Sequence, residues 1–499
     1  MRGDGMALKL IYKDLALGAA EDAAVSVDKA ASFSTPAELP FGVDTGAVAT
    51  LEPNGWGLSH DYKAKNNQPF AFWTNATSDA EGVFATPPVI TIEFDEQYTS
   101  SGLTFRFSPG ANEWCSEIRV LWYQNGAKKD EGIFYPDAPL YAVENAVEAF
   151  DKVVVELLKT SLPNRRAKLE YIRIGVIREI DGRELTGASF IHEIDLVSDT
   201  VPINVMDATF HSRTNVEYVF QSKQPVEAYD GENLIGIYYI EKGNRTGARD
   251  YTISCQDAIG ILDRDTFGGG IWLEDTPISE MLLEVVDGSF ELDIAPELSN
   301  VTLRGYIPES TKREALQQIA FAAGVCIDTA GSAKIRVFPP QTGNGAEIPA
   351  AETYTGGQVD TSETVTAVIM EYYDILDIPP EERDERDETL EFKGKEYVLI
   401  TDVLRVDNPN LTVGAIKNRV EYKGCYLINS SNSGKRASAL LAYHMRKKRY
   451  STAHVLHDQK PGDRVNVALP WGETQNGNIV KMTVTISGIN ASNTEFLLD

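Results

Sequence analysis

The chain has 499 residues, of which 42% are hydrophobic and 24% are charged. This is the composition of a folded globular protein, and the length predicts roughly three or four domains. The formal net charge of −28 gives a surface that repels DNA and anionic membranes, which argues against nucleic-acid binding as the main function. An acidic wall would still suit a duct through which DNA slides, although a merely soluble acidic surface is the commoner explanation of such a charge.

The cysteines and the N-terminal segment point to no special compartment. Cys115, Cys255, Cys326 and Cys425 lie far apart with no metal-type spacing, so buried free thiols are expected. No apolar run follows Met1, and no stretch has the length of a membrane-spanning helix. We therefore expect synthesis in the cytoplasm, no signal peptide and no membrane span.

The first part of the chain has a β pattern. Residues 1–40 are an Ala-rich lead-in with one expected strand, and residues 41–195 alternate aromatic or β-branched residues with polar ones. Asn125-Gly126 predicts a hairpin turn. The segment 141–158 fits either an amphipathic helix or strands, and its alternation with β-branched residues favours strands, with the helix left open. Strands are also expected at 8–12, 89–94, 103–107, 118–123 and 171–177.

In the middle of the chain the residue pattern changes from strands alone to a mixture of helices and strands. Residues 200–265 are expected to form strands, including 216–220, and residues 266–345 a small α/β unit. Thr276 is expected to cap a helix with Pro277 at its first position. Thr311 and Glu314 form a capping-box pattern for a second helix, which Gly324 ends.

The remaining residues, 346–499, are expected to be mostly β with one helix. The expected elements are a strand at 365–373, a charged loop at 379–391, a helix at 438–449 ending in Arg-Lys-Lys-Arg, and strands at 463–469 and 480–486. On the last strand, Val480, Met482, Val484 and Ile486 mark the buried face.

No constellation in the sequence predicts catalysis. The six histidines form no metal motif, and His454 and His457 are expected on opposite faces of a strand. There is no nucleophile elbow, no phosphate-binding loop, and no reason to prefer any pair among the 74 acidic residues as a glycosidase pair. We expect no enzyme activity, no catalytic residue, no cofactor and no metal.

Two segments carry a family resemblance. Residues 251–263 (YTISCQDAIGILD) and 305–320 (GYIPESTKREALQQIA), followed by 438–449 and 460–467, resemble the baseplate hub, or tail-associated hub, proteins of long-tailed phages and phage-tail-like particles. The resemblance implies a homotrimeric ring at the virion tail tip, with two tail-tube-like β-barrels per protomer and a channel that passes DNA. It also implies contacts with the tail tube or distal tail protein, the tape-measure protein, and tip or fibre proteins.

A second segment, 87–175, is similar to discoidin-like or carbohydrate-binding-module-like jelly rolls. Such domains often bind glycans through loop aromatics, although a tryptophan in a sandwich core is the commoner arrangement. The candidate sugar-binding residues are Trp56, Phe72, Trp73, Asn75, Arg106 and Trp114.

The predicted fold is therefore mainly β and multidomain: two tube-like β-barrels with a small α/β domain between them, plus a β-sandwich jelly roll near the N-terminus. The expected domains are the lead-in 1–40, the inserted jelly roll 41–195, the first barrel 196–265, the α/β domain 266–345 and the second barrel 346–499. The predicted function is a structural tail-tip hub. The alternatives are a glycan-binding tail protein and a tail-associated cell-wall hydrolase. We expect residues 480–498 to be the last hub strand pair, with no lytic domain after them, and this expectation counts against the hydrolase.

Overall fold

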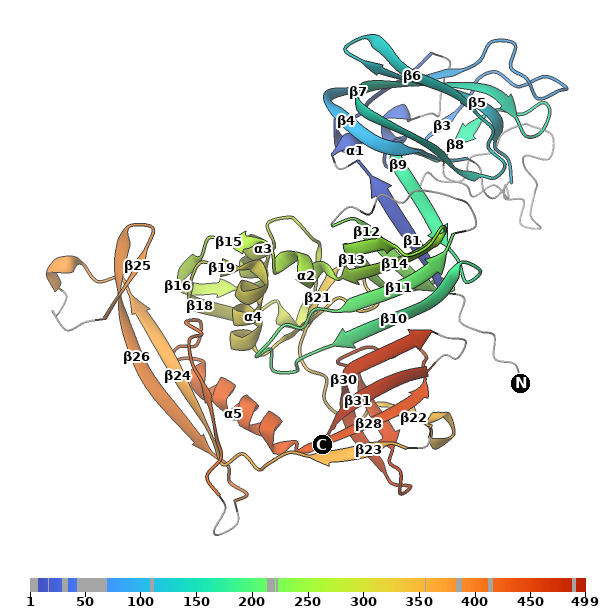
Figure 1. The fold of residues 1–499 in the computed structure, drawn as a ribbon. Helices are drawn as coiled ribbons and strands as arrows, with labels where there is room; N and C mark the ends of the chain where they lie inside the picture. Colours follow the sequence, from blue (N-terminus) through green and yellow to red (C-terminus); the bar gives the residue numbers. More distant parts are fainter. Residues whose placement is uncertain are drawn as a thin grey trace, which may run out of the picture. The chain divides into compact units, whose positions relative to one another are not determined.

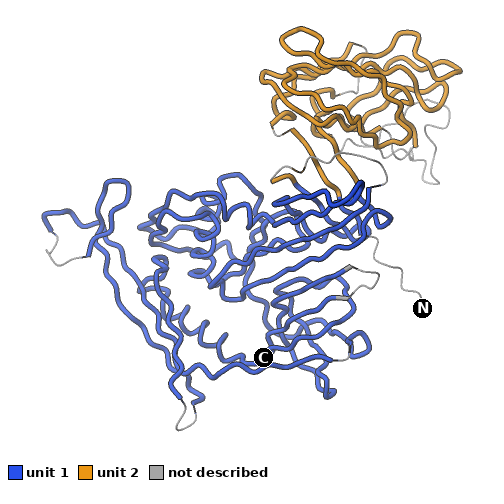
Figure 2. Tube along the Cα trace, viewed as in Figure 1, with its two compact units in different colours: residues 1–10, 180–216, 225–499 blue, residues 11–179, 217–224 orange. Residues whose placement is uncertain are grey.

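A computed structural model describes residues 8–16, 18–28, 35–42, 70–107, 112–212, 220, 223–354, 356–382, 388–411, 416–486 and 491–499. The protein is mainly β and divides into two compact units (Figure 2). Unit 1 comprises Met1–Leu10, Ile180–Val216 and Pro225–Asp499, and unit 2 comprises Ile11–Glu179 and Glu217–Gln224. Most of the expected strand at 216–220 lies outside the described residues.

Unit 2 is built on two long strands, β4 (Val89–Arg106) and β7 (Leu140–Thr160), which pair antiparallel along most of their length. The segment 141–158 is therefore strand, as predicted. Asn125 and Gly126 have φ of 50° and 78° and form the expected turn between β5 and β6. The other elements of this region are β1 (Leu8–Leu15), α1 (Ala19–Asp22), β2 (Ala24–Val27), η1 (Pro36–Glu38), β3 (Phe72–Trp73), β5 (Cys115–Gln124), β6 (Ala127–Phe134), β8 (Lys168–Leu169) and β9 (Tyr171–Ile180).

Five strands of unit 1 form what we call the first strand set, in the spatial order β10-β11-β14-β13-β12, with every neighbouring pair antiparallel. These strands are β10 (Leu185–Glu193), β11 (Val205–His211), β12 (Pro225–Asp230), β13 (Asn233–Arg245) and β14 (Asp250–Gln256). β1 lies next to β12 on its other side.

Five later strands form the second strand set, in the order β23-β28-β31-β30-β29, again with every neighbouring pair antiparallel. They are β23 (Gln358–Thr361), β28 (Lys448–Val455), β29 (Arg464–Ala468), β30 (Thr474–Ile486) and β31 (Ala491–Leu498), and β22 (Ala346–Ile348) lies next to β29. In both sets the first strand in chain order pairs with the second, the second with the fifth, the fifth with the fourth, and the fourth with the third. The two sets therefore share one topology.

The two sets also share a bulge and a burial pattern. The ladder shifts between Ile240 and Lys242 on β13 and between Ile479 and Lys481 on β30. When these two bulges are aligned, each residue of the first set has an equivalent residue in the second set. The equivalent residues named below are buried in both sets, because side chains at every second position of a strand face the core. The matching pairs are Met206 and Tyr450, Ala208 and Thr452, Phe210 and His454, Val226 and Val465, Ile253 and Thr494, and Cys255 and Phe496.

β10 and β30 join the two strand sets into one continuous sheet (Figure 1). Ala188–Glu193 run antiparallel to Lys481–Ile486, so β10 belongs to the first set by one edge and contacts the second set by the other. Closure of either set into the expected tube-like barrel stays a prediction.

A helical layer follows the first strand set. α4 (Lys312–Ala323) has the predicted capping box at Thr311 and ends at Gly324, whose φ is 72°. α3 (Ile278–Val286) begins one residue later than expected, with Pro277 and not Thr276 as its N-cap. Leu282, Leu316 and Ile319 belong to its buried core. The remaining elements are α2 (Ala258–Leu262), β15 (Thr266–Phe267), β16 (Gly270–Pro277), β17 (Leu292–Ile294), η2 (Pro296–Leu298), β18 (Thr302–Ile307), β19 (Ser310–Thr311), β20 (Cys326–Asp328) and β21 (Ile335–Phe338).

A second sheet, in the order β25-β26-β24-β27, is inserted between β23 and β28, and β24 and β26 form a long ribbon (Figure 1). Its strands are β24 (Ala367–Leu376), β25 (Glu388–Phe392), β26 (Lys395–Asp407) and β27 (Arg419–Tyr422), with η3 (Ala350–Glu352) before it and η4 (Pro380–Glu382) within it. The expected loop at 379–391 is thus wrong for 388–391, which pair with β26. Residues 383–387 lie outside the described residues.

The helix expected at 438–449 is α5 (Ser433–Met445), so both predicted ends were wrong. It begins five residues earlier, and the basic run does not close it. Lys448 and Arg449 instead open β28, where they pair with Thr361 and Asp360 of β23. Pairing with a strand distant in sequence outweighs the local preference of cations for a helix C-terminus.

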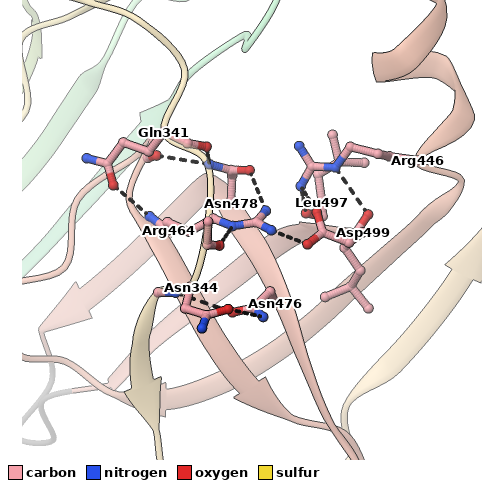
Figure 3. Close-up of polar contacts among 12 residues, drawn as sticks. Gln341, Asn344, Arg446, Arg464, Asn476, Asn478, Leu497 and Asp499 are labelled. Carbon is pink, nitrogen blue, oxygen red and sulfur yellow. Dashed lines mark hydrogen bonds and ion pairs between the residues drawn. The ribbon is translucent and has the colours of Figure 1, made fainter.

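A polar cluster holds the second strand set together (Figure 3). Arg464 of β29 donates from Nη1 to Oδ1 of Asn478 at 3.1 Å and from Nε to the carbonyl of Gly343 at 2.7 Å, and it forms an ion pair with Asp499. Arg446 also contacts the Asp499 carboxylate, at 3.4 Å. The cluster therefore ties β29, β30 and the residue after β31 to the segment before β22.

Candidate functional site

The candidate site is the junction of the two strand sets, where a cavity of about 340 Å³ opens beside the β10–β30 ladder. His192 of β10 and Met482 of β30 are opposite each other in this ladder, and both line the cavity. Leu456 and Pro461, from the segment between β28 and β29, also line it. The cavity is thus a property of the junction and belongs to neither set alone.

His192 forms the buried polar floor of this junction. Its Nε2 lies 2.5 Å from the hydroxyl of Tyr238 on β13, and the two rings stack with an interplanar angle of 8°. Burial lowers the pKa of His192 to about 4 and raises the pKa of Tyr238 well above its ordinary value. The imidazole is therefore neutral at physiological pH and acts as a hydrogen-bonding partner, not as a charge.

A second buried network lies beneath the junction and joins the first strand set to the helical layer. Thr329 donates to Oδ2 of Asp257 at 2.6 Å and accepts from the Asn204 amide at 3.0 Å. Asn204 also reaches Oδ1 of Asp328 at 3.2 Å, and Asp328 forms an ion pair with Arg336. Burial raises the pKa of Asp257 to about 6, although three hydrogen bonds to the carboxylate oppose the shift.

The rim of the cavity carries both signs of charge. Asp230, Glu232 and Asp458 line it together with Lys460, whose Nζ donates to the carbonyl of Gly331 at 3.1 Å. His457 also lines the cavity and contacts a carboxylate of Glu352 at 3.0 Å, whereas His454 is fully buried. The acidic excess at this rim suits a cationic or polar partner surface better than an anionic one.

The chemistry available to the described residues is limited. Among them, no group of three or more His, Cys, Asp or Glu side chains could hold a metal ion. The four cysteines are free and buried, and burial raises the pKa of Cys115 to about 12, so that thiol is not a nucleophile. No helix in the part of the chain described here is long and apolar enough to cross a membrane.

The predicted sugar-binding residues of unit 2 differ in their surroundings. Phe72 and Trp73 are buried, with 1% and 7% of their surface exposed, and belong to the packed interior. Arg106 lies 3.6 Å from Glu170 in an ion pair, and Trp114 is half-buried against the core. Asn75 is exposed and accepts from Arg166 through its backbone carbonyl, while Trp56 lies outside the described residues.

The junction itself was missed by the sequence reasoning. The only local signal was alternation on β10 and β30, where Phe190 and His192 are buried on one strand and Met482 and Val484 on the other. This alternation predicts strands with one buried face but does not say which strands pair.

No protein-family model matches the chain, and no curated protein matches its sequence. Among solved structures, the 43 kDa tail protein of prophage MuSo2 from Shewanella oneidensis is 9% identical, with a TM-score of 0.46 over 64% of this chain and 95% of that chain. A tail protein from Neisseria meningitidis MC58 is 14% identical, with a TM-score of 0.44 over 64% and 93% of the two chains. A chain of the native gene transfer agent particle virion is 11% identical, with a TM-score of 0.32 over 100% and 86%. A likeness at this level assigns no role to this chain.

Proposed function

We propose that this protein is a structural hub at the tip of a phage-type tail, where three copies form a ring that connects the tail tube to the tip. The observation that carries the proposal is the edge-to-edge pairing of two strand sets of the same topology through β10 and β30. One chain thus contains two equivalent wall segments in a fixed arrangement. Three such chains would present six segments, which matches a sixfold tube.

The chemistry of the junction supports a structural role over a catalytic one. Its histidine is held neutral by burial, the buried Asp257 carboxylate accepts a hydrogen bond from Thr329, and the described residues bring together no metal-ligand cluster. The partners of the ring would be the tail tube or distal tail protein, the tape-measure protein and tip or fibre proteins. With a net charge of −28, an acidic channel wall would let DNA pass without adhering.

The direct test is the mass and shape of the purified chain. Mass photometry at micromolar concentration should find particles of three times the 54.9 kDa chain mass, and electron microscopy should find rings with an axial channel. A chain that is monomeric at every concentration and in the presence of its tail-tube protein would contradict the hub. A calculated potential that is positive along the ring axis would contradict the acidic channel.

Carbohydrate binding by unit 2 is the alternative proposal, and it depends on Asn75, Arg106 and Trp114, because Phe72 and Trp73 are in the packed interior. A glycan array should then show binding that is lost in the Trp114→Ala variant. No binding by the wild-type chain would leave unit 2 as a contact for neighbouring tail proteins.

A further inference from the structure

The cavity at the junction of the two strand sets has apolar walls. Its lining includes Leu234 and Ile235 of β13, Leu456 after β28, and Met482 and Val484 of β30. Its volume of about 340 Å³ lies within the range of small-ligand pockets, which is about 300–1,000 Å³. A space of this size and lining suits one aromatic ring together with the short chain that carries it.

The floor of the cavity offers a hydrogen-bond donor. His192 is only 6% exposed and contacts the Tyr238 hydroxyl through Nε2, and among the described residues its Nδ1 has no hydrogen-bond partner. Within the same residues, Nε2 is also the one partner of the buried Tyr238 hydroxyl. The tyrosine therefore donates to Nε2, since the opposite arrangement would bury its proton without an acceptor. The neutral imidazole then carries its own proton on Nδ1, and His192 lines the cavity.

The rim of the cavity carries carboxylates that are free to bind a cation. Asp230 ends β12, Glu232 lies in the turn that follows, and Asp458 lies between β28 and β29. No hydrogen bond or ion pair in the described part of the chain engages these three side chains. Lys460 also lies on the rim, but it donates to the carbonyl of Gly331. A bound group therefore meets unpaired negative charge at the mouth and an N–H donor at the floor.

We propose that this cavity receives a tyrosine side chain of a neighbouring protein, with a lysine or arginine of that protein beside it. The phenol oxygen accepts from Nδ1 of His192, the ring lies between the apolar walls, and the cation meets the carboxylates of the rim. Tyrosine meets these demands because it joins a rigid apolar ring to a neutral polar group at its end. An anionic ligand would also accept from the imidazole, but the rim repels it. The site lies within one chain and does not depend on the proposed ring.

Tyramine is the small-molecule probe, because it joins a phenol to an ammonium group. Isothermal titration of the full chain at low ionic strength should give saturable binding, since salt screens the charges of the rim. Phenethylamine lacks the hydroxyl, and 3-(4-hydroxyphenyl)propionate carries a carboxylate in place of the ammonium. Each should bind about tenfold more weakly, because each loses one of the two polar contacts. If either binds as tightly as tyramine, or if tyramine does not bind, the proposal is overturned.

Two variants test the two ends of the site. His192→Phe keeps an aromatic ring but removes the N–H, so it should bind tyramine and phenethylamine equally, a loss of selectivity that a purely structural role does not predict. Glu232 is exposed, so Glu232→Lys leaves the core intact and tests the rim even if His192→Phe fails to fold. It should reduce the preference for the ammonium over the carboxylate ligand by about tenfold.

The matched control is Glu347→Lys, which makes the same charge change at an exposed position of β22 that does not line the cavity. It should leave the affinities for both ligands unchanged. Equal effects of Glu232→Lys and Glu347→Lys would overturn the cavity as the binding site.

A peptide pair tests the source of the tyrosine. The capped peptide Gly-Lys-Tyr-Lys-Gly should bind at least as tightly as tyramine, and Gly-Lys-Phe-Lys-Gly about tenfold more weakly. Binding of tyramine without binding of the tyrosine peptide would overturn a protein side chain as the occupant. Mass photometry of the same samples tests the ring separately. Trimers without peptide binding overturn this site and keep the hub, whereas peptide binding by a chain that stays monomeric keeps the site and contradicts the hub.

Discussion

Glu193 and Lys481 face each other at one end of the ladder that joins the two strand sets, with Oε2 and Nζ 3.3 Å apart. Both side chains are partly exposed, so this ion pair contributes little to stability. The junction depends instead on its backbone hydrogen bonds and on the apolar side chains beneath them.

Phe190, on β10, is fully buried and pairs with Val484. We expect Phe190→Ala to lower the free energy of unfolding by about 3–5 kcal/mol, because it leaves a cavity under the ladder. Lys481→Ala, on the exposed side of the same ladder, should cost less than about 1 kcal/mol. Urea unfolding of both variants tests this, and equal losses would show that the ion pair contributes as much to the junction as the packing of Phe190 does.

His192 should stay neutral well below its ordinary titration range, because burial lowers its pKa to about 4 from 6.5. As pH falls from about 6.5 to 4, the unfolded chain gains a proton on this histidine that the folded chain does not, so this group lowers stability in that window. NMR of the imidazole signals, with His192→Phe to assign the resonance, measures it directly. Titration of that resonance near pH 6.5 would contradict a buried, neutral His192.

The contribution of Asp257 to stability should change with pH in the opposite direction to that of His192. Burial raises the pKa of Asp257 from 3.8 to about 6, with Asp328 adding to the shift. Between about pH 4 and 6 the folded state keeps a proton that the unfolded state has released. Stability from this group is therefore present at pH 4 and is lost as pH rises through 6. A difference of roughly two pKa units corresponds to about 3 kcal/mol.

The Asp257→Asn variant isolates this contribution. The wild type should lose stability relative to the variant on going from pH 4 to pH 7, as measured by urea unfolding at both pH values. A stability difference between the two proteins that does not change with pH would refute the raised pKa. His192→Phe serves as the control. The stability difference between the wild type and this variant should change with pH in the opposite sense, because His192 lowers stability as pH falls.

Glu113 anchors a buried charge cluster in unit 2, with its carboxylate 2.6 Å from Arg165 and 3.0 Å from Lys168. Glu113→Gln should destabilise unit 2 by about 3–5 kcal/mol, because the two cations lose their buried counter-charge. The control is Glu156→Gln, whose pair with Arg119 is more exposed and should contribute less than about 1 kcal/mol. Similar thermal unfolding of both variants would mean that water reaches the Glu113 cluster.

Arg464 should govern how firmly the last strand is held (Figure 3). Only 10% of its side chain is exposed, and Arg464→Ala removes the hydrogen bonds to Asn478 and Gly343 and the ion pair with Asp499. Amides of β31 should then exchange faster with deuterium by tenfold or more, since each hydrogen bond to a charged group contributes about 1.5–3 kcal/mol. Arg449→Ala, whose Nη1 is 4.0 Å from Glu495 of β31, is the exposed control and should leave exchange unchanged.

Local signals in the sequence predicted local structure well. The Asn125-Gly126 turn, the Thr311 capping box and the Gly324 helix end are confirmed, because each depends on backbone geometry within a few residues. The predicted helix end at Arg446–Arg449 was wrong, because Lys448 and Arg449 pair with β23, which lies nearly 90 residues earlier in the chain. The predicted sugar-binding aromatics illustrate the same limit, since only burial distinguishes a core tryptophan from an exposed one.

By itself, the sequence determined that this is a mainly β protein with a few helices and no recognisable catalytic motif, since side-chain periodicity and capping chemistry are local properties. Only the tertiary structure decided that two strand sets share one topology and meet at β10 and β30. Strands pair through backbone hydrogen bonds, which are the same for every residue type, so matching positions can hold Phe210 in one set and His454 in the other. The topology that the two sets share is therefore visible in the pairing of their strands and not in their residues.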